Sequence, residues 1–191
     1  MGEQAADGEL VRRFTAGDPA AFEQLVSRHE ERLYNLSYRM LGSREDARDA
    51  TQEAFLAALR ALPSFRGDAA FTTWLHRIAV NACYDVLRRQ RRAPVADVAE
   101  DAETWPPSPD HAESAATAVD VQRALARVPE EFRAVLVLHD VQDLPYEQIG
   151  AILGIPVGTV KSRLHRGRVS LAGLLRGTPG APAPSEGTVT T

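Results

Sequence analysis

Apolar residues recur every three or four positions along much of this chain, a spacing that puts them on one face of a helix. The N-terminal half shows three such stretches, and the first runs from Phe22 to Met40. Residues that end helices separate the stretches, namely Gly42 after the first and Pro63 after the second. We therefore expect helices at about 18–41, 43–62 and 71–92, which together form one helical domain at residues 10–92.

The pattern disappears at residue 93 and returns in the C-terminal part of the chain. Residues 93–117 contain four prolines and six acidic residues, a composition typical of an extended linker. Beyond them, apolar periodicity broken at Pro129 predicts further helices, and residues 118–176 form the second domain. Residues 177–191 are rich in glycine and proline and are expected to be disordered. Since no stretch alternates as a strand does, the expected fold is all-α: two small helical domains joined by an acidic, proline-containing linker.

The second domain contains the most informative motif, between Asp143 and Arg168. Pro145 suits the start of a short helix, Gly154 suits a turn, and a second helix is expected from about Val157. Two helices joined by a short glycine turn form a helix-turn-helix, whose second helix enters the major groove of DNA.

The outward face of that second helix is basic. At about 100° per residue, its apolar residues share one face, while Ser162, His165 and Arg166 lie opposite. Ser162 and Arg168 are placed to meet a base or a phosphate. A solvated basic helix on an ordinary bundle is the alternative. Residues 157–176 hold five basic residues and no acidic one, and together with the turn this favours DNA binding.

A second candidate site lies between Phe65 and Asn81. Its apolar residues at helical spacing, Trp74 among them, fit a packed core. The same stretch, together with the arginines at 88–92, also supplies aromatic faces, the imidazole of His76, an amide and positive charge. Such groups hold an unstacked base of single-stranded DNA. The residues alone leave both interpretations open.

Composition and charge narrow the classes of protein further. Of the 191 residues, 44% are hydrophobic and 25% are charged, which fits a folded protein with an ordinary surface. The net charge is −4, but residues 93–119 hold six acids and no Lys or Arg, so neither flanking half is acidic. Cys83 is the only cysteine, which excludes a disulfide framework within the chain and fits a reducing cytoplasm. We expect Cys83 and the lone histidines His29 and His139 to be structural residues rather than metal ligands.

Several expectations are negative. No apolar run reaches the roughly 18 to 20 residues that span a bilayer, so we expect no membrane insertion. No glycine-rich phosphate loop, nucleophile triad or carboxylate pair is present in the sequence, so we expect neither a cofactor nor enzymatic activity.

Five motifs follow one another in a fixed order along the chain. They are Asp46-Ala-Arg-Asp-Ala-Thr-Gln-Glu-Ala-Phe55, Phe65-Arg-Gly-Asp68, Phe71–Asn81, Leu144–Gly150 and Pro156–Arg166. In this order, and with a linker between the third and the fourth, they resemble an RNA polymerase sigma factor of the extracytoplasmic-function (ECF) group of the sigma-70 family. The resemblance covers residues 10–92, as sigma region 2, and residues 118–176, as sigma region 4.

The resemblance implies three groups of site residues. The helix at 43–62 would bind core polymerase through Asp46, Asp49, Gln52, Glu53 and Phe55. The minus-ten element would be read and its flipped base held by Phe65, Gly67, Asp68, Trp74, His76, Arg77, Asn81 and Arg88. The minus-thirty-five element would be read by Thr159, Lys161, Ser162, Arg163, His165 and Arg166.

The implied function is to bind core RNA polymerase, through its β′ clamp and β flap, and to direct initiation and DNA melting at promoters. An anti-sigma factor is a further implied partner, and the acidic linker would thread near the polymerase's active centre. A dimeric helix-turn-helix regulator with an N-terminal helical sensor is the main alternative, but it leaves the motifs at 46–55 and 65–81 unexplained. A small helical enzyme would need a cluster of titratable residues that the sequence does not offer.

Overall fold

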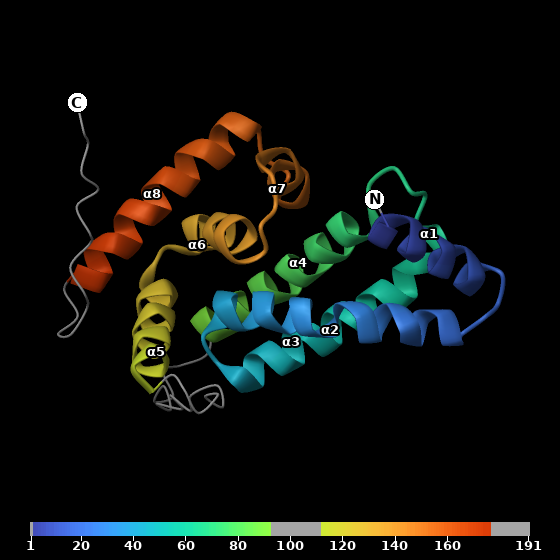
Figure 1. Ribbon diagram of the computed structural model, residues 1–191, viewed down its shortest axis with the longest axis horizontal. Coiled ribbons are helices and arrows are strands. Elements are labelled where there is room, and N and C mark those ends of the chain that lie inside the picture. Colours follow the sequence, from blue (N-terminus) through green and yellow to red (C-terminus); the bar gives the residue numbers. More distant parts are fainter. Residues whose placement is uncertain (1, 93–111, 177–191) are drawn as a thin grey trace.

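The structure is a computed structural model that describes residues 2–92 and 112–176 (Figure 1). These residues form helices and no strand, which confirms the all-α prediction. The N-terminal half contains α1 (Gly2–Thr15), α2 (Ala20–Leu41), α3 (Arg44–Ala61), the short 3-10 helix η1 (Leu62–Ser64) and α4 (Phe71–Arg92). The C-terminal half contains α5 (Ala112–Arg127), α6 (Glu130–Leu136), the π-helical turn η2 (Val137–Val141), α7 (Tyr146–Leu153) and α8 (Val157–Arg176).

The three helices expected in the N-terminal half are present and pack on one another as α2, α3 and α4. Gly42 ends α2 with a φ of 80°, which an L side chain rarely adopts. Ser43 then caps α3, because its Oγ accepts a hydrogen bond of 3.2 Å from the backbone N–H of Asp46. The buried faces of these helices meet in a core that includes Leu33 and Leu75.

Helix α1 was not predicted, because we placed the start of the first domain at residue 10. Leu10 and Val11 of α1 belong to the core. One turn earlier, the buried position is held by Asp7, a polar residue. A charged residue at a buried position removes the apolar repeat on which the prediction of a helix depends.

The C-terminal half follows the expected order of helices, with one difference at its start. Pro129 separates α5 from α6 as predicted. Helix α5 begins at Ala112, so residues 112–117, which we assigned to the linker, are helical. This segment is rich in alanine, which favours helix without marking an apolar stripe. The rest of the predicted linker, residues 93–111, and the tail at 177–191 lie outside the described residues.

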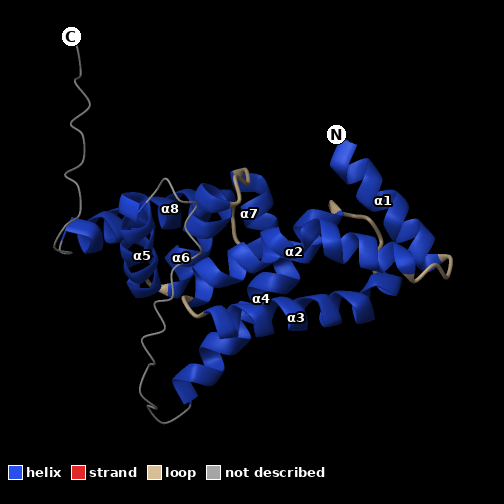
Figure 2. Ribbon diagram, turned by 60° about the horizontal axis from the view of Figure 1, so that its bottom comes forward, coloured by secondary structure: helices blue, strands red, loops and turns tan. Residues whose placement is uncertain are grey.

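The two halves are in contact, which the sequence did not predict. Helix α2 packs against α5, α6 and η2, and helix α4 packs against α7. Figure 2 shows α5, α6 and α8 grouped at one end of the molecule and α1 at the other. A single apolar cluster runs through both halves, from Leu10 to Leu164.

Candidate functional site

The helix-turn-helix is formed by α7 and α8, as predicted. The turn between them passes through Gly154, whose φ of 66° is left-handed. Gly150 lets the turn close tightly, since a Cβ at this position would lie 2.9 Å from the carbonyl oxygen of Ile155. Val160 and Leu164 face inward and are buried. The first turns of α8 are therefore held firmly against the rest of the C-terminal half.

Most of the residues predicted to read the minus-thirty-five element lie on the solvent side of α8. Lys161, Ser162, His165 and Arg166 are exposed, and Thr159 is half-buried. They come from one helix face and form a continuous polar surface, which we call the α8 reading face.

Arg163 belongs to the predicted set but points elsewhere. It is half-buried, and its Nη2 lies 2.9 Å from a carboxylate oxygen of Glu131 on α6. This ion pair connects α8 to α6, so in this arrangement Arg163 supports the helix from behind the reading face.

Arg168 was expected to meet a base or a phosphate, but it forms an ion pair within the protein. Its Nη2 lies 2.5 Å from Asp140 of η2. Burial would raise the pKa of the Asp140 carboxyl, but hydrogen bonds from Arg168 and His139 outweigh burial and lower that pKa. The hydrogen bond to Asp140 also raises the pKa of the Arg168 guanidinium. The pair fixes the middle of α8 to the π-helical turn.

The predicted minus-ten residues surround the loop that leads into α4. Phe65 packs on Trp74 and on Phe71, with ring centroids 5.0 and 6.1 Å away. Gly67, at a φ of 76°, and Asp68 form the exposed tip of the loop. The aromatic rings thus form a half-buried cluster beneath an exposed loop, with Trp74 serving the core as the spacing indicated.

Further along α4, three of the predicted residues are exposed. Arg77 and Asn81 are free to contact a ligand from solvent. Arg88 is also exposed and forms an ion pair with Asp85, one turn earlier on the same helix. The solvent side of α4 therefore carries an amide and arginines next to the loop.

Unlike the other predicted minus-ten residues, His76 is fully buried. Its Nδ1 lies 2.6 Å from the carbonyl oxygen of Thr72, and its Nε2 lies 3.5 Å from Oε1 of Gln142 in the C-terminal half. Burial lowers the pKa of the imidazole, although both of these hydrogen bonds oppose the change. In this arrangement the ring is covered and cannot stack on a base.

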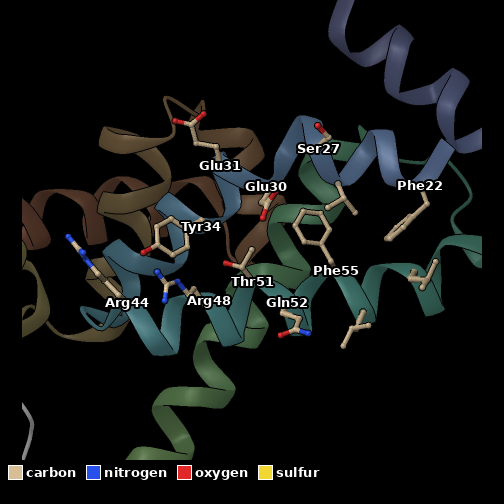
Figure 3. Close-up of a pocket in the computed structure, with 13 residues that line it drawn as sticks. Phe22, Ser27, Glu30, Glu31, Tyr34, Arg44, Arg48, Thr51, Gln52 and Phe55 are labelled. Carbon is tan, nitrogen blue, oxygen red and sulfur yellow. The ribbon is translucent and has the colours of Figure 1, made fainter. Parts of the chain in front are cut away.

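A groove of about 840 Å³ lies between α2 and α3 (Figure 3). Of the predicted polymerase-binding residues, Gln52 and Phe55 line it. Figure 3 shows Phe22 and Phe55 between the two helices, with Arg44 and Arg48 toward the other end, near Tyr34. The groove is thus apolar at one end and polar at the other.

Several groove residues were missed by the sequence analysis. Leu56 and Leu59 line the groove and are 43% and 38% exposed, so they add apolar surface that solvent can reach there. The apolar stripe of its helix predicts that Phe22 packs in the core, but Phe22 also lines the groove. The signal that could have revealed the groove is the second row of apolar residues on α3, outside its alanine-rich buried face.

Arg44 is a further groove residue with an unusual environment. Its Nη2 is buried and has no hydrogen-bond partner among the described residues. A buried guanidinium nitrogen without an acceptor is energetically costly.

The acidic residues predicted to bind polymerase lie beside the groove rather than in it. Asp49 and Glu53 are exposed, and Glu53 pairs with Arg60 at 3.0 Å. Asp46 is half-buried and accepts a hydrogen bond of 3.0 Å from Gln90 of α4. These three carboxylates do not line the groove.

The described residues offer little for metal binding. Across residues 2–92 and 112–176, no group of three His, Cys, Asp or Glu side chains could hold a metal ion. None of the helices in this part of the chain is long and apolar enough to cross a bilayer.

Taken together, the helix-turn-helix with its basic reading face, the aromatic loop on α4 and the separate apolar groove define a DNA-binding protein that also docks on another protein. Comparisons with known proteins identify the family. The family description "Sigma-70 region 2" matches residues 25–93, and "Sigma-70, region 4" matches residues 118–171.

Relatives support the same family over most of the chain. The ECF RNA polymerase sigma factor SigM of Mycobacterium tuberculosis is 45% identical over 172 residues, covering 90% of this chain and 86% of the relative. The ECF RNA polymerase sigma-E factor of Escherichia coli is 40% identical over 182 residues, covering 90% of this chain and 95% of the relative.

Among solved structures, CnrH in complex with the cytosolic domain of CnrY has a similar fold, with a TM-score of 0.69 and 29% identity over 90% of this chain and 97% of that one. The chain belongs to the ECF group of the sigma-70 family. It is a sigma factor that directs RNA polymerase to promoters for the initiation of transcription.

Proposed function

We propose that the two described halves divide the work of promoter recognition. The region 2 half, at 10–92, binds core polymerase and reads the minus-ten element, and the region 4 half, at 118–176, reads the minus-thirty-five element. The observation that carries this proposal is the presence, in one chain, of a basic α8 reading face and a separate apolar groove between α2 and α3.

The groove is our candidate for the surface that binds the β′ clamp. Its apolar end, with Phe55, Leu56 and Leu59, would bury side chains of the polymerase. Asp49 and Glu53 lie beside this surface and would attract basic residues of the polymerase.

The loop and α4 are our candidate for the minus-ten surface. Phe65 and Trp74 supply aromatic faces for a flipped base, and the exposed amide of Asn81 can hydrogen-bond a base edge. Arg77 and Arg88 would contact phosphates, so this binding should weaken as salt rises. Capture of unstacked bases would favour the melted duplex.

The α8 reading face would lie in the major groove at the minus-thirty-five element. Lys161 and Arg166 can donate to guanine edges or phosphates, and His165 and Ser162 can contact neighbouring bases or the backbone. The remainder of the region 4 half would contact the β flap. We assign no catalytic role and no cofactor to this chain, because the chemistry of RNA synthesis belongs to the polymerase, and we place its activity in the cytoplasm.

We also propose an anti-sigma factor as a partner. The related protein CnrH has been solved with the cytosolic domain of CnrY bound to it. Exposed apolar residues on both halves of this chain, Leu56 and Val169 among them, would give such a partner a surface to bind.

The test is transcription in vitro with purified core polymerase on fragmented genomic DNA, with and without this protein, followed by mapping of the starts. New starts that share two spaced upstream elements would support the proposal and reveal the promoter. No new starts, together with binding of the protein alone to palindromic duplex sites, would instead support a dimeric regulator.

A further inference from the structure

The two helices of the helix-turn-helix touch through an exposed lysine and a half-buried tyrosine. Nζ of Lys161 lies over the ring of Tyr146, 5.7 Å from the ring centroid. A cation is attracted to an aromatic face within about 6 Å. Lys161 is in the second turn of α8 and belongs to the α8 reading face, whereas Tyr146 is the first residue of α7. A residue proposed to read DNA is thus held by a side chain from the preceding helix.

The ring of Tyr146 is itself fixed in place. It packs on the apolar core. It also stacks on the imidazole of His139 from η2, with centroids 5.1 Å apart and an angle of 26° between the planes. Nδ1 of His139 lies 2.7 Å from Oδ1 of Asp140, which also pairs with Arg168. The ring is therefore held from the core and from η2, and these contacts form without DNA.

The turn between η2 and α7 brings His139 and Tyr146 together. Asp143 has a left-handed φ of 54°, a conformation that aspartate adopts more often than most residues. The backbone N–H of Leu144 then donates to the carbonyl oxygen of Leu138 at 3.1 Å, which closes the turn. As a result, the two rings can stack, and the start of α7 lies beside η2.

Holding Lys161 over the ring should strengthen DNA binding. A free lysine side chain has many rotamers, and those that do not reach the DNA are lost on binding. An attraction between a cation and a ring at an exposed site corresponds to about two- to fivefold in an equilibrium constant. An ammonium has three N–H donors, so Lys161 can stay over the ring and still donate to a guanine edge or a phosphate.

The contact with a ring also leaves the charge of Lys161 available. Arg163 and Arg168 of the same helix pair with the carboxylates of Glu131 and Asp140, which offset their positive charge. An aromatic ring orders a cation without neutralising it. Lys161 is thus both ordered and fully charged, and both properties favour contact with the negatively charged DNA.

We propose that Tyr146 is a positioning residue for the reading of the minus-thirty-five element, and that its ring, with its stacking partner His139, orients Lys161 toward the DNA. This inference rests on the proposed role of the α8 reading face. Because Tyr146 acts through Lys161, the effect of removing the ring must vanish once Lys161 has been removed.

The first measurement observes the contact directly. Lys161 is the only lysine in the chain, so protein made with ¹³C-labelled lysine gives NMR signals from this side chain alone. In the free protein, the ring current of Tyr146 should move the ε-CH₂ signal to a lower frequency than in a flexible lysine. Tyr146→Phe keeps a ring and should keep this displacement, whereas Tyr146→Leu should lose it. His139→Ala, which removes the stacking partner, should reduce it.

The second measurement is a double-mutant cycle on DNA binding. The full-length parent, Tyr146→Leu, Lys161→Ala and the double variant are each assembled with core polymerase. Their affinities are measured for a promoter duplex recovered in the transcription assay. Lys161→Ala should weaken binding about tenfold, and Tyr146→Leu about two- to fivefold. The double variant should bind no more weakly than Lys161→Ala alone, and Tyr146→Phe should bind as the parent protein does.

The same cycle separates positioning from a defect in folding. If Tyr146→Leu lowers the stability of the protein, the loss is present with and without Lys161, so it adds to the effect of Lys161→Ala instead of vanishing. His139→Ala provides a second variant for the comparison, since its effect on DNA binding should also vanish in the absence of Lys161.

Two results would overturn the proposal: a Lys161 signal that is the same in the parent and in Tyr146→Leu, or additive losses of affinity in the cycle. Equal losses in Tyr146→Phe and Tyr146→Leu would also overturn it, because the hydroxyl rather than the ring would then carry the effect. Failure of the proposed function is distinguishable, since the parent protein itself would then direct no promoter-specific starts, and this inference would fall with it.

Discussion

Asp7 of α1 and His29 of α2 are both buried and lie in contact, with Oδ2 of Asp7 3.0 Å from Nε2 of His29. The other carboxylate oxygen of Asp7 lies 2.6 Å from Nη1 of Arg28. His29 in turn packs against the ring of Phe71 on α4, with centroids 5.6 Å apart. This polar contact attaches the unpredicted helix α1 to the rest of the N-terminal half.

Replacing Asp7 should therefore destabilise the protein strongly. Asp7→Ala leaves the buried imidazole of His29 and the guanidinium of Arg28 without their shared acceptor, and we expect a loss of about 3 kcal/mol in the free energy of unfolding. Urea denaturation measures the free energy of unfolding of each variant. Glu9→Ala, which breaks an exposed ion pair with Arg12 on the same helix, is the control and should cost less than about 0.5 kcal/mol. Similar losses in the two variants would contradict the structural role of Asp7.

The close approach of α8 to α6 predicts a difference between two glycines on α8. A Cβ at Gly167 would lie 3.0 Å from atoms of Leu136 and 3.3 Å from the carbonyl oxygen of Phe132, whereas nothing lies within 4 Å of a Cβ at Gly173. Gly167→Ala should lower the free energy of unfolding by about 1 to 3 kcal/mol through overpacking. Gly173→Ala should instead raise it by about 0.5 kcal/mol, because alanine favours helix. Thermal unfolding measures the change in stability of each variant, and equal changes would be inconsistent with this packing of α8 on α6.

The groove between α2 and α3 predicts that polymerase binding can be weakened without lowering the stability of the protein. Leu56→Asp and Leu59→Asp place charge on two exposed groove residues, so folding should be little affected. Binding to core polymerase should weaken at least tenfold, since each loses roughly 1.5 kcal/mol of apolar burial. Gel filtration or surface binding with purified core measures the affinity, and Gln24→Asp, exposed on α2 and outside the groove lining, is the matched control. Retained affinity in the leucine variants would remove the groove from the polymerase interface.

Two arginines on α8 should have different roles. Arg166 is exposed on the α8 reading face, while Arg163 is half-buried and paired with Glu131. Arg166→Ala should reduce initiation that depends on the minus-thirty-five element, without weakening polymerase binding or stability. We expect a loss of about tenfold or more, corresponding to one base contact. Arg163→Ala should mainly lower the temperature of thermal unfolding, because it removes the ion pair with Glu131. Unchanged promoter selectivity in Arg166→Ala would overturn the assignment of this face.

The burial of His76 predicts a dependence of stability on pH. Burial lowers the pKa of His76 below its ordinary value of 6.5. The unfolded chain therefore binds a proton at this residue before the folded protein does. Stability should fall as pH drops below about 6.5, by up to about 1.4 kcal/mol per pH unit, and should level off below the lowered pKa.

The variant His76→Asn should lack this part of the pH dependence. Urea denaturation between pH 5 and pH 7.5 gives the slope for each protein. His165→Asn, which replaces an exposed histidine on α8, should keep the slope of the parent protein. If His76→Asn has the same slope as the parent, the buried imidazole is not the group that responds.

Local patterns were sufficient to predict much of this fold. The stripe on α2, the cap at Ser43 and the break at Pro129 each depend on residues within one or two helical turns, and the helices begin and end close to these signals. The helix-turn-helix around Gly154 was predicted on the same basis, because a left-handed turn between two amphipathic helices depends on the local sequence. Cys83 and His29 are buried, as expected of structural residues.

The contacts that the predicted site residues make depend on the tertiary structure more than on the local sequence. The helical repeat correctly placed Ser162, His165 and Arg166 on the solvent side of α8. It could not show that Arg168 pairs with Asp140, since these residues are 28 positions apart and meet only when α8 folds back on η2. The same limit applies to the groove, whose lining comes from two helices.

The sequence by itself thus determined most of the helices, several of their ends and the order of the two halves, because each depends on neighbours along one helix. Only the tertiary structure decided that Asp7 is buried, that a groove opens between α2 and α3, and that Gln142 reaches His76, 66 positions away, so that one half covers part of the other. Such contacts form between side chains from distant parts of the chain, and a repeat of three or four residues carries no information about which distant helix a given face will meet.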